Sequence, residues 1–264
     1  MNNIRLGLQT HAVREAFSED PKSTLKRVAE MGYECVEVTS EVLNGKFSLE
    51  YYVEALGESG LECVSSTTSW KAVLPEAIDN TIAFFKGLGM STVVIGSVDF
   101  KALAADPSYA KTALDLMLSA YERLTSEGFS VGYHAHDGDF MNSVGDVPFY
   151  EYIMANTPKE FQMIEDTGNI FMGGGDPLSL LKKFPGRSPL AHIKGCSKEL
   201  GYLTPVWQAE LDWDVLIPAF VEEGGSHTFI IEFGARGDYE PFDRAQRSYT
   251  WLREQVKKGG YKCK

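Results

Sequence analysis

Short apolar runs alternate with longer segments in which apolar residues recur at helical spacing. The short runs predict strands at Ile4–Gln9, Tyr33–Val38, Leu61–Ser65, Thr92–Ile95, from Ser130 onward, Phe161–Glu165, Leu190–Ile193 and Thr228–Phe233. The longer segments predict helices over about 21–31, 47–56, 75–88, 107–127, 147–155, 177–181, 213–223 and 239–257. Asp-Pro pairs at 20–21, 106–107 and 176–177 are typical helix starts, with Asp as the N-cap.

Strands that alternate with helices predict a parallel sheet whose strands are buried on both faces. Eight such units in 264 residues favour a closed (β/α)8 TIM barrel over an open doubly wound sheet. No Gly-x-Gly-x-x-Gly follows the first strand, which argues against a dinucleotide-binding domain. No linker breaks the series, so we expect one domain over residues 1–264.

The formal net charge of −12 argues against nucleic acid or an anionic membrane as the main partner, because both are bound through basic patches. The chain has no apolar run of transmembrane length and no signal-peptide pattern at its start. Its four cysteines are scattered without metal or redox spacing. We therefore expect a cytoplasmic protein that acts on a small neutral sugar or polyol; a homo-oligomer stays open.

Chemistry-bearing side chains gather at the predicted strand ends, where TIM barrels carry their active sites. Four of the five histidines, His11, His134, His136 and His192, lie there. His134 and His136 are two residues apart, so both point to one side of the fifth strand.

Strands five to eight place a mixed set of imidazoles and carboxylates at equal depth: His134, Asp166, His192 and Glu232. We expect these four to bind a divalent metal. A nitrogen and oxygen set without thiolates suits Mn²⁺, Mg²⁺, Co²⁺ or Zn²⁺. An ion with open positions polarises a bound carbonyl and stabilises the enediolate formed when a base removes the neighbouring proton.

Other residues of the same face have two interpretations each. His136 is a substrate contact or supports a ligand, and Lys194 is a donor to substrate oxygens or a surface lysine. The further candidates for substrate binding are His11, Glu37, Trp70, Trp207 and Arg236. His11 and Glu37 belong to the pocket or to the framework, and the two tryptophans stack on sugar rings or pack on the barrel rim.

Several motifs, in order along the whole chain, resemble the xylose isomerase-like TIM barrels known as sugar phosphate isomerases/epimerases, in the superfamily that includes AP endonuclease family 2. The matching stretches are Gly7–Arg14, Gly132–His136, Asp166–Asn169, His192–Lys194 and Ile231–Phe233. The resemblance implies this fold and a metal site at His134, Asp166, His192 and Glu232.

The chain departs from the family pattern at five places. His11 replaces a tyrosine, Ala135 an asparagine, Gly195 an acidic residue, Thr67 a histidine, and 208–210 a Gly-x-Gly. In epimerase relatives a glutamate matches His134, which leaves Glu232 as the better base here. Each departure changes the polarity of the pocket.

We hypothesise a metal-dependent isomerase or epimerase of a sugar or keto-sugar, in which Glu232 moves the proton with help from His136 or Lys194. A lyase or dehydratase acting on a keto-sugar, an inosose or a 3-keto-glycoside would use the same residues. A sugar-binding barrel without catalysis is the third hypothesis. An endonuclease is least favoured because the chain is acidic.

Overall fold

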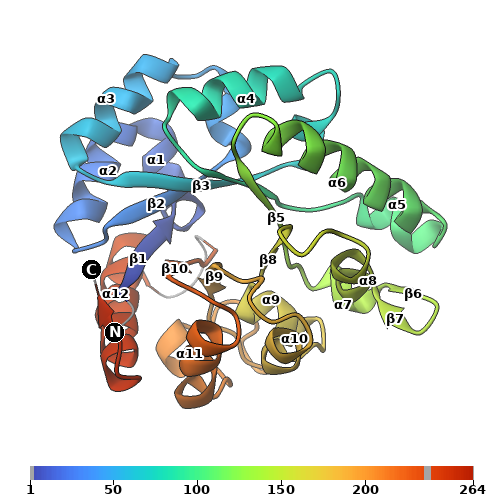
Figure 1. The fold of residues 1–264 in the computed structure, drawn as a ribbon. Coiled ribbons are helices and arrows are strands. Elements are labelled where there is room, and N and C mark those ends of the chain that lie inside the picture. The colour runs from blue at the N-terminus through green and yellow to red at the C-terminus, as the bar shows by residue number, and fades with distance from the viewer. Residues whose placement is uncertain (1–2, 235–238, 264) are drawn as a thin grey trace.

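The computed structural model describes residues 3–234 and 239–263, and its centre is a barrel of parallel strands (Figure 1). Neighbouring strands follow the order β8-β5-β4-β3-β2-β1-β10-β9, and all of these pairs are parallel. Their bounds are β1 Asn3–Gln9, β2 Cys35–Thr39, β3 Glu62–Thr68, β4 Thr92–Ile95, β5 Ser130–His134, β8 Gln162–Ile164, β9 Leu190–Ile193 and β10 Thr228–Ile231.

The two end strands of this order, β8 and β9, meet through a narrow contact. Asp166 and His192 form a single parallel bridge, and the backbone N–H of His192 donates to the carbonyl of Glu165 at 2.8 Å. The eight strands therefore form a nearly closed barrel, and the predicted (β/α)8 architecture is confirmed.

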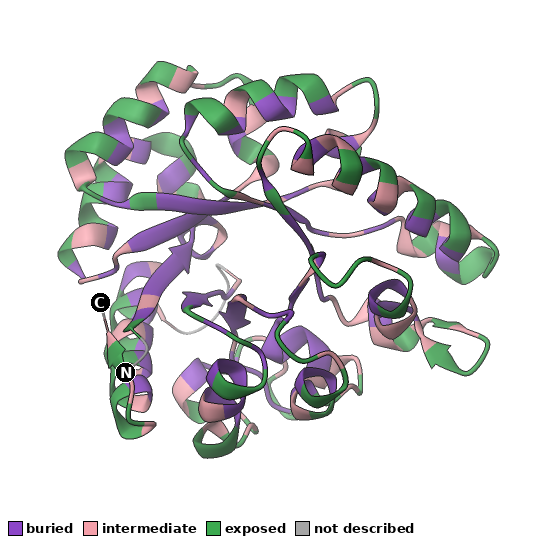
Figure 2. Cartoon of the chain, viewed as in Figure 1, coloured by how far each residue is buried: buried purple, intermediate pink, exposed green. Residues whose placement is uncertain are grey.

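Helices surround the barrel, and each has a buried and an exposed side, as the burial colours in Figure 2 show; most of the buried residues are apolar. The helices that pack between successive barrel strands, or after the last, are α2 Pro21–Glu30, α3 Leu49–Ser59, α4 Ile78–Gly87, α6 Tyr109–Thr125, α8 Phe149–Ala155, α10 Pro177–Lys183, α11 Trp213–Glu222 and α12 Pro241–Lys258. Shorter helices are α1 Arg14–Glu19, α5 Phe100–Ala105, α7 Gly138–Met141 and α9 Thr167–Met172. Within residues 3–234 and 239–263, no helix has the length and apolar content to cross a membrane.

The predicted boundaries differ from the observed ones where side chains or turns intervene. The hairpin of β6 Ser143–Val144 and β7 Val147–Pro148 delays the helix expected from 147 until Phe149. Asp20 and Asp176 accept backbone N–H groups at the starts of α2 and α10, as expected. Asp106 also accepts a backbone N–H, that of Ser108, but α6 begins only at Tyr109, with Ser108 as its N-cap.

The interior of the barrel is filled by a layer of small and branched side chains. Six strands each contribute one: Cys35, Val64, Val94, Ile164, Leu190 and Ile230. The remaining two strands contribute glycine. A Cβ at Gly7 would lie 2.5 Å from Ile230 Cδ1, and one at Gly132 would lie 2.8 Å from Ile164 Cγ1. Glycine at these positions lets the side chains of neighbouring strands fill the barrel interior beneath the strand ends.

A bulge in β3 changes which residues face the interior. Val36 pairs with Cys63, but Glu37 pairs with Ser65, so β3 contains one extra residue at this point. A bulge re-aims the side chains that follow it. Here Val64 stays in the interior layer while Ser65 and Thr67 both donate to Glu37.

Candidate metal centre and adjoining pocket

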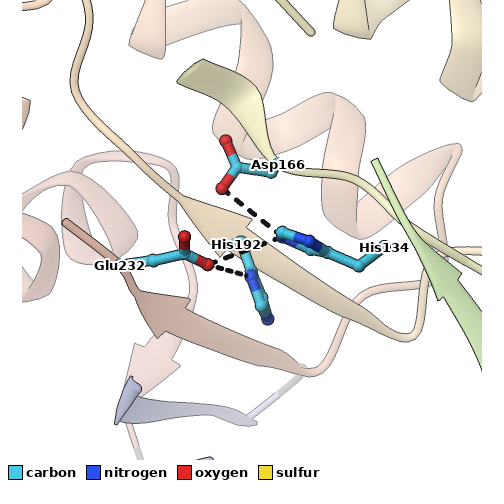
Figure 3. A group of neighbouring side chains, drawn as sticks. All are labelled: His134, Asp166, His192 and Glu232. Carbon is cyan, nitrogen blue, oxygen red and sulfur yellow. Dashed lines mark hydrogen bonds and ion pairs between the residues drawn. The ribbon is translucent and has the colours of Figure 1, made fainter. Parts of the chain in front are cut away.

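Four side chains converge at the carboxyl ends of β5, β8, β9 and β10 (Figure 3). They are His134, Asp166, His192 and Glu232, and each offers a ligand atom within 4.8 Å of the others. All four are buried. Ligands about 2.0–2.2 Å from a common ion lie roughly 3–4.4 Å from one another, so the spacing is close to that of a coordination shell.

His134 faces both carboxylates of this cluster. Its Nε2 lies 3.5 Å from Asp166 Oδ2 and 3.5 Å from Glu232 Oε2. Neither ring nitrogen of His134 has a hydrogen-bond partner among the described residues, and neither has Asp166 Oδ2. Buried polar atoms are rarely left without a partner, and an ion is one explanation. The arrangement therefore fits a bound metal.

Neighbouring backbone and side chains fix the orientation of Asp166. Its Oδ1 accepts the N–H of Asn169 at 2.7 Å, at the start of α9. This bond occupies one carboxylate oxygen and leaves Oδ2 directed at His134. At the Asp-Thr-Gly-Asn sequence the strand thus gives way to a helix, and the second carboxylate oxygen of Asp166 is turned toward the cluster.

His192 lies between two carboxylates. Its Nδ1 is 2.7 Å from Glu232 Oε2, and its Nε2 is 3.0 Å from Glu37 Oε1, although off the hydrogen-bond direction. Glu37 is fully buried and also accepts from Gln9, Ser65 and Thr67, each at 2.7 Å. A histidine ligand is commonly oriented by a carboxylate on its other nitrogen. Glu37 is placed for that role.

Lys194 brings a buried ammonium group into the same cluster. Its Nζ lies 2.9 Å from Glu232 Oε1, 3.5 Å from Asp166 Oδ2 and 3.0 Å from Asn169 Oδ1. The ring of Tyr202 covers it, with the centroid 4.9 Å away. The Tyr202 hydroxyl in turn donates to Asp137 Oδ2 at 3.0 Å. Lys194 is therefore held in place and is not a mobile surface lysine.

The charges of the cluster set its proton affinities. Burial lowers the pKa of His192, but Glu37 and Glu232 outweigh it and raise this pKa to about 10. Burial and nearby His192 lower the pKa of His134, but Asp166 and Glu232 outweigh them and leave this pKa above its usual value. Burial raises the pKa of Glu232, but Lys194 and the two imidazoles hold it well below its usual range. In the metal-free protein His192 therefore retains its proton and Glu232 remains a carboxylate.

A cavity of about 260 Å³ opens above the cluster. His134 and Glu232 form part of its wall. The rest is mostly hydroxyl and amide groups, with His11 and His136: Gln9, Thr39, Ser40, Thr67, Thr68, Ser69 and Ser97. No lysine, arginine or aspartate belongs to the described lining. Such a wall suits an uncharged ligand with several hydroxyl groups.

His136 and Thr68 present unpaired atoms in this wall. His136 Nδ1 and Thr68 Oγ1 are buried and have no hydrogen-bond partner within the described chain. Burial and nearby His134 lower the pKa of His136 to about 4, so its ring is neutral at pH 7. Asp139 holds the turn by accepting the backbone N–H of His136 at 2.7 Å. Both free atoms are available to a ligand.

The remaining substrate candidates have different positions. His11 lines the pocket, whereas Glu37 lies beneath it and contacts His192. In the described part of the chain, the pocket lining includes neither tryptophan. Trp207 packs against Tyr239 and Arg247, and Trp70 packs against the core next to Lys71. Arg236 lies outside the described residues.

Of the hydroxyl groups that make up most of the wall, the sequence interpretation singled out only Thr67, as a departure from the family pattern. They come from the Thr39-Ser40 and Thr67-Thr68-Ser69 segments, which directly follow or end β2 and β3. Their place at strand ends was a usable signal, but serine and threonine are common in loops and carry little chemical information alone.

Comparison with known proteins gives matches at the level of structure. No family model matches the chain, and no curated protein matches it. A sugar phosphate isomerase/epimerase from Parabacteroides distasonis superposes with a TM-score of 0.73 at 22% identity, over 96% of this chain and 94% of that one. The IOLI protein, solved with a binding zinc atom, has a TM-score of 0.72 at 16% identity, over 97% and 99%.

A third solved structure is the D-allulose 3-epimerase from Methylomonas sp. in complex with D-allulose. Its TM-score is 0.73 at 11% identity, over 97% of this chain and 98% of that chain. These likenesses confirm the fold expected from the sequence motifs, that of the xylose isomerase-like TIM barrels.

Proposed function

We propose that this protein is a metal-dependent isomerase or epimerase of an unphosphorylated sugar or keto-sugar. The observation that carries the proposal is the pair of buried atoms His134 Nε2 and Asp166 Oδ2, 3.5 Å apart beside Glu232 and His192, neither with a hydrogen-bond partner in the described chain. The fold shared with sugar isomerases and epimerases supports the same assignment.

His134, Asp166, His192 and Glu232 would hold a divalent ion, with Mn²⁺, Mg²⁺, Co²⁺ and Zn²⁺ as the candidates. When bound, the ion would supply Lewis acidity toward a substrate carbonyl and lower the cost of removing the neighbouring proton. The zinc in the IOLI structure supports a metal in this fold.

The chain's own residues would handle the proton. Glu232 reaches the pocket and is kept ionised by Lys194 and the imidazoles, which is the charge state that a general base requires. Neutral His136, with its free Nδ1, would donate to or accept from a substrate hydroxyl. Lys194 would hold Glu232 in position through its bond to Oε1.

Pocket chemistry supports a substrate without phosphate. A phosphate group is commonly bound by arginine, lysine or a helix N-terminus with glycine-rich backbone. The described pocket lining instead offers hydroxyl groups, one amide, one carboxylate and three imidazoles. His11 is one of these imidazoles, and burial lowers its pKa, so it adds little positive charge.

The proposal is tested by measuring metal content and solvent-deuterium exchange into unphosphorylated ketoses, inosose and 3-keto-glycosides. Deuterium in a product that otherwise keeps the molecular formula of its substrate, lost on chelation and restored by Mn²⁺, would support isomerisation or epimerisation. A product lighter by water or an aglycone would identify the lyase. Absence of metal and of exchange into any sugar would leave the non-catalytic sugar-binding barrel.

A matched pair of histidine variants separates the site from general effects. His134→Gln removes an expected ligand, and we expect it to lose metal and exchange activity. His227→Gln alters an exposed histidine just before β10, next to Thr228 and away from the pocket lining, and should retain both. Equal activity in the two variants would contradict the assignment.

A further inference from the structure

The pocket adjoins the metal cluster on one side only. Its described lining comes from the ends of β1, β2, β3, β4, β5 and β10 or from the turns that follow them, and none of it comes from the segments after β8 or β9. Around the barrel, β8 and β9 fill the remaining sector between β5 and β10 (Figure 1). The cluster therefore has a pocket side and a β8–β9 side.

The side chain of Lys194 occupies the β8–β9 side. Its Nζ bonds Glu232 Oε1 and lies 3.5 Å from Asp166 Oδ2, yet Lys194 is absent from the described pocket lining. The backbone N–H of Lys194 donates to Thr167 Oγ1 at 2.9 Å, and this hydroxyl donates to the Lys194 carbonyl at 3.0 Å. A Cβ at Gly168 would lie 2.9 Å from Lys194 Cγ. The lysine stem thus packs directly on the start of α9.

Tyr202 covers this lysine from the loop after β9. Its ring centroid is 4.9 Å from the lysine Nζ, and its hydroxyl donates to Asp137 Oδ2 in the turn after β5. Tyr202 therefore connects the segments after β9 and β5 across the end of β8, which lies between them. The loop is anchored from α12, because Arg244 Nη2 donates to the carbonyl of Thr204 at 3.0 Å.

Gly195 allows the loop to fold back closely enough for this cover. A Cβ at Gly195 would meet the carbonyl oxygen of Thr204 and would lie 2.6 Å from the backbone nitrogen of Val206. A larger residue would displace the segment that follows Tyr202. The glycine that replaces an acidic residue of the family pattern is thus tied to the position of Tyr202 over Lys194.

We propose that Lys194 and Tyr202 close the β8–β9 side of the cluster, so that a metal ion exchanges with solvent only through the sugar pocket. This inference rests on the metal assignment of the proposed function. A sugar in the pocket would then block the route of the ion. Metal would bind before sugar, and bound sugar would slow metal loss. Tyr202 is in this scheme a positioning residue for Lys194.

Measured rates separate a change of route from a change of ligands. Uptake of Mn²⁺ by the metal-free full chain and its release to EDTA can be followed by the EPR signal of free Mn²⁺. Opening or blocking a route changes both rates by the same factor and leaves Kd unaltered, because Kd depends only on the free and bound states. Damage to the ligands instead raises the release rate and Kd together.

Tyr202→Ala removes the cover. We expect uptake and release both to become about tenfold faster, with Kd almost unaltered. Leu203→Ala is the control, because Leu203 is exposed in the same loop, and it should leave both rates unchanged. Melting curves establish that both variants fold. Unaltered rates in Tyr202→Ala, or faster release with an equal loss of affinity, would overturn the proposal.

Ser97→Trp and Thr39→Trp each add an indole to the pocket of about 260 Å³, from the segments at the ends of β4 and β2. At least one of them should slow uptake and release alike by about tenfold, without changing Kd. Combined with Tyr202→Ala, the same substitution should no longer slow exchange, because a second route is then open. Undiminished rates in both tryptophan variants would overturn the proposal.

Failure of this inference is distinguishable from failure of the proposed function. If the chain binds Mn²⁺ and exchanges deuterium into sugars, but its metal exchange rates ignore both sets of variants, only the route is wrong and the isomerase assignment stands. If the chain binds none of Mn²⁺, Mg²⁺, Co²⁺ and Zn²⁺, both proposals are overturned.

Discussion

Lys194 Nζ lies 2.9 Å from Glu232 Oε1, on the opposite oxygen of the carboxylate from the one that faces His192 and His134. One oxygen of Glu232 is thus engaged by an ammonium group, and the other faces the imidazoles. Lys194 also lies 3.5 Å from Asp166 Oδ2, so a single buried cation partly neutralises both carboxylates of the candidate metal centre.

Replacing Lys194 by Met should strengthen metal binding and weaken catalysis. Removal of a positive charge next to two ligand carboxylates leaves them more negative, and we expect Mn²⁺ affinity to rise by at least about tenfold. Deuterium exchange should fall by about a hundredfold because Glu232 loses its positioning contact. Titration with Mn²⁺ and exchange assays measure the two effects.

Lys198→Met serves as the control for Lys194→Met, because Lys198 is exposed in the same loop. Its Mn²⁺ affinity and exchange rate should match those of the unmodified protein. Unchanged or weaker Mn²⁺ binding by Lys194→Met would contradict the counter-ion role of Lys194.

Metal loading should release protons from the imidazoles. The pKa of His192 is raised to about 10 in the metal-free protein, so this ring is protonated near neutral pH, and the pKa of His134 is raised as well. Coordination requires neutral imidazole, and we therefore expect about one to two protons to leave per ion bound. Metal affinity should then increase as pH rises toward 10.

Calorimetric titrations of Mn²⁺ in buffers with different ionisation enthalpies count the released protons. Whereas metal affinity should increase with pH, the contribution of His192 to the stability of the metal-free fold should decrease with pH. A histidine pKa raised above the unfolded value of 6.5 stabilises the metal-free fold below pH 6.5, and this contribution disappears as pH rises through about 10. Binding without proton release would show that His192 is not a ligand.

Glu37→Gln tests whether this carboxylate orients His192 or contacts substrate. Glutamine preserves size but removes the charge 3.0 Å from His192 Nε2. If Glu37 orients the ligand, metal affinity should fall about 10- to 100-fold. Exposed Glu41→Gln, four residues along the same segment, should leave it unchanged. Altered KM for sugar with normal metal affinity would favour the substrate role.

Two glycine substitutions should change stability in opposite directions. Gly132→Ala places a Cβ 2.8 Å from Ile164 Cγ1 and 2.9 Å from the Gln162 carbonyl oxygen, so overpacking should cost about 1–3 kcal/mol. Gly57→Ala lies on an exposed position of α3 with no neighbour within 4 Å, and should stabilise by about 0.5–1 kcal/mol. Urea denaturation measures both; equal midpoints would contradict the packing argument.

Periodicity was enough to predict the barrel, because eight alternating units leave few other ways to bury strands on both faces. It also predicted that His134, Asp166, His192 and Glu232 would meet, since strand ends converge in that architecture. The same periodicity predicted that Glu37 points into the barrel. It could not predict that Glu37 lies beneath the pocket, because that depends on its contact with His192.

Other features required coordinates. The bulge in β3 depends on the register between two strands distant in sequence, and it decides that Ser65 and Thr67 bind Glu37. The packing of Trp207 against Tyr239 and Arg247 depends on a loop meeting α12 and the segment before it. Local pattern carries no information about either contact.

The narrow contact between β8 and β9 gives the metal cluster a mechanical consequence. Asp166 and His192 are the only residues that form a parallel bridge there in the described chain, and both belong to the cluster. An ion bound by these two residues would connect the two ends of the strand order where a single bridge joins them. Removal of the ion by a chelator would then weaken the contact between β8 and β9. The amide protons of these two strands would exchange with solvent before those of β2 and β3.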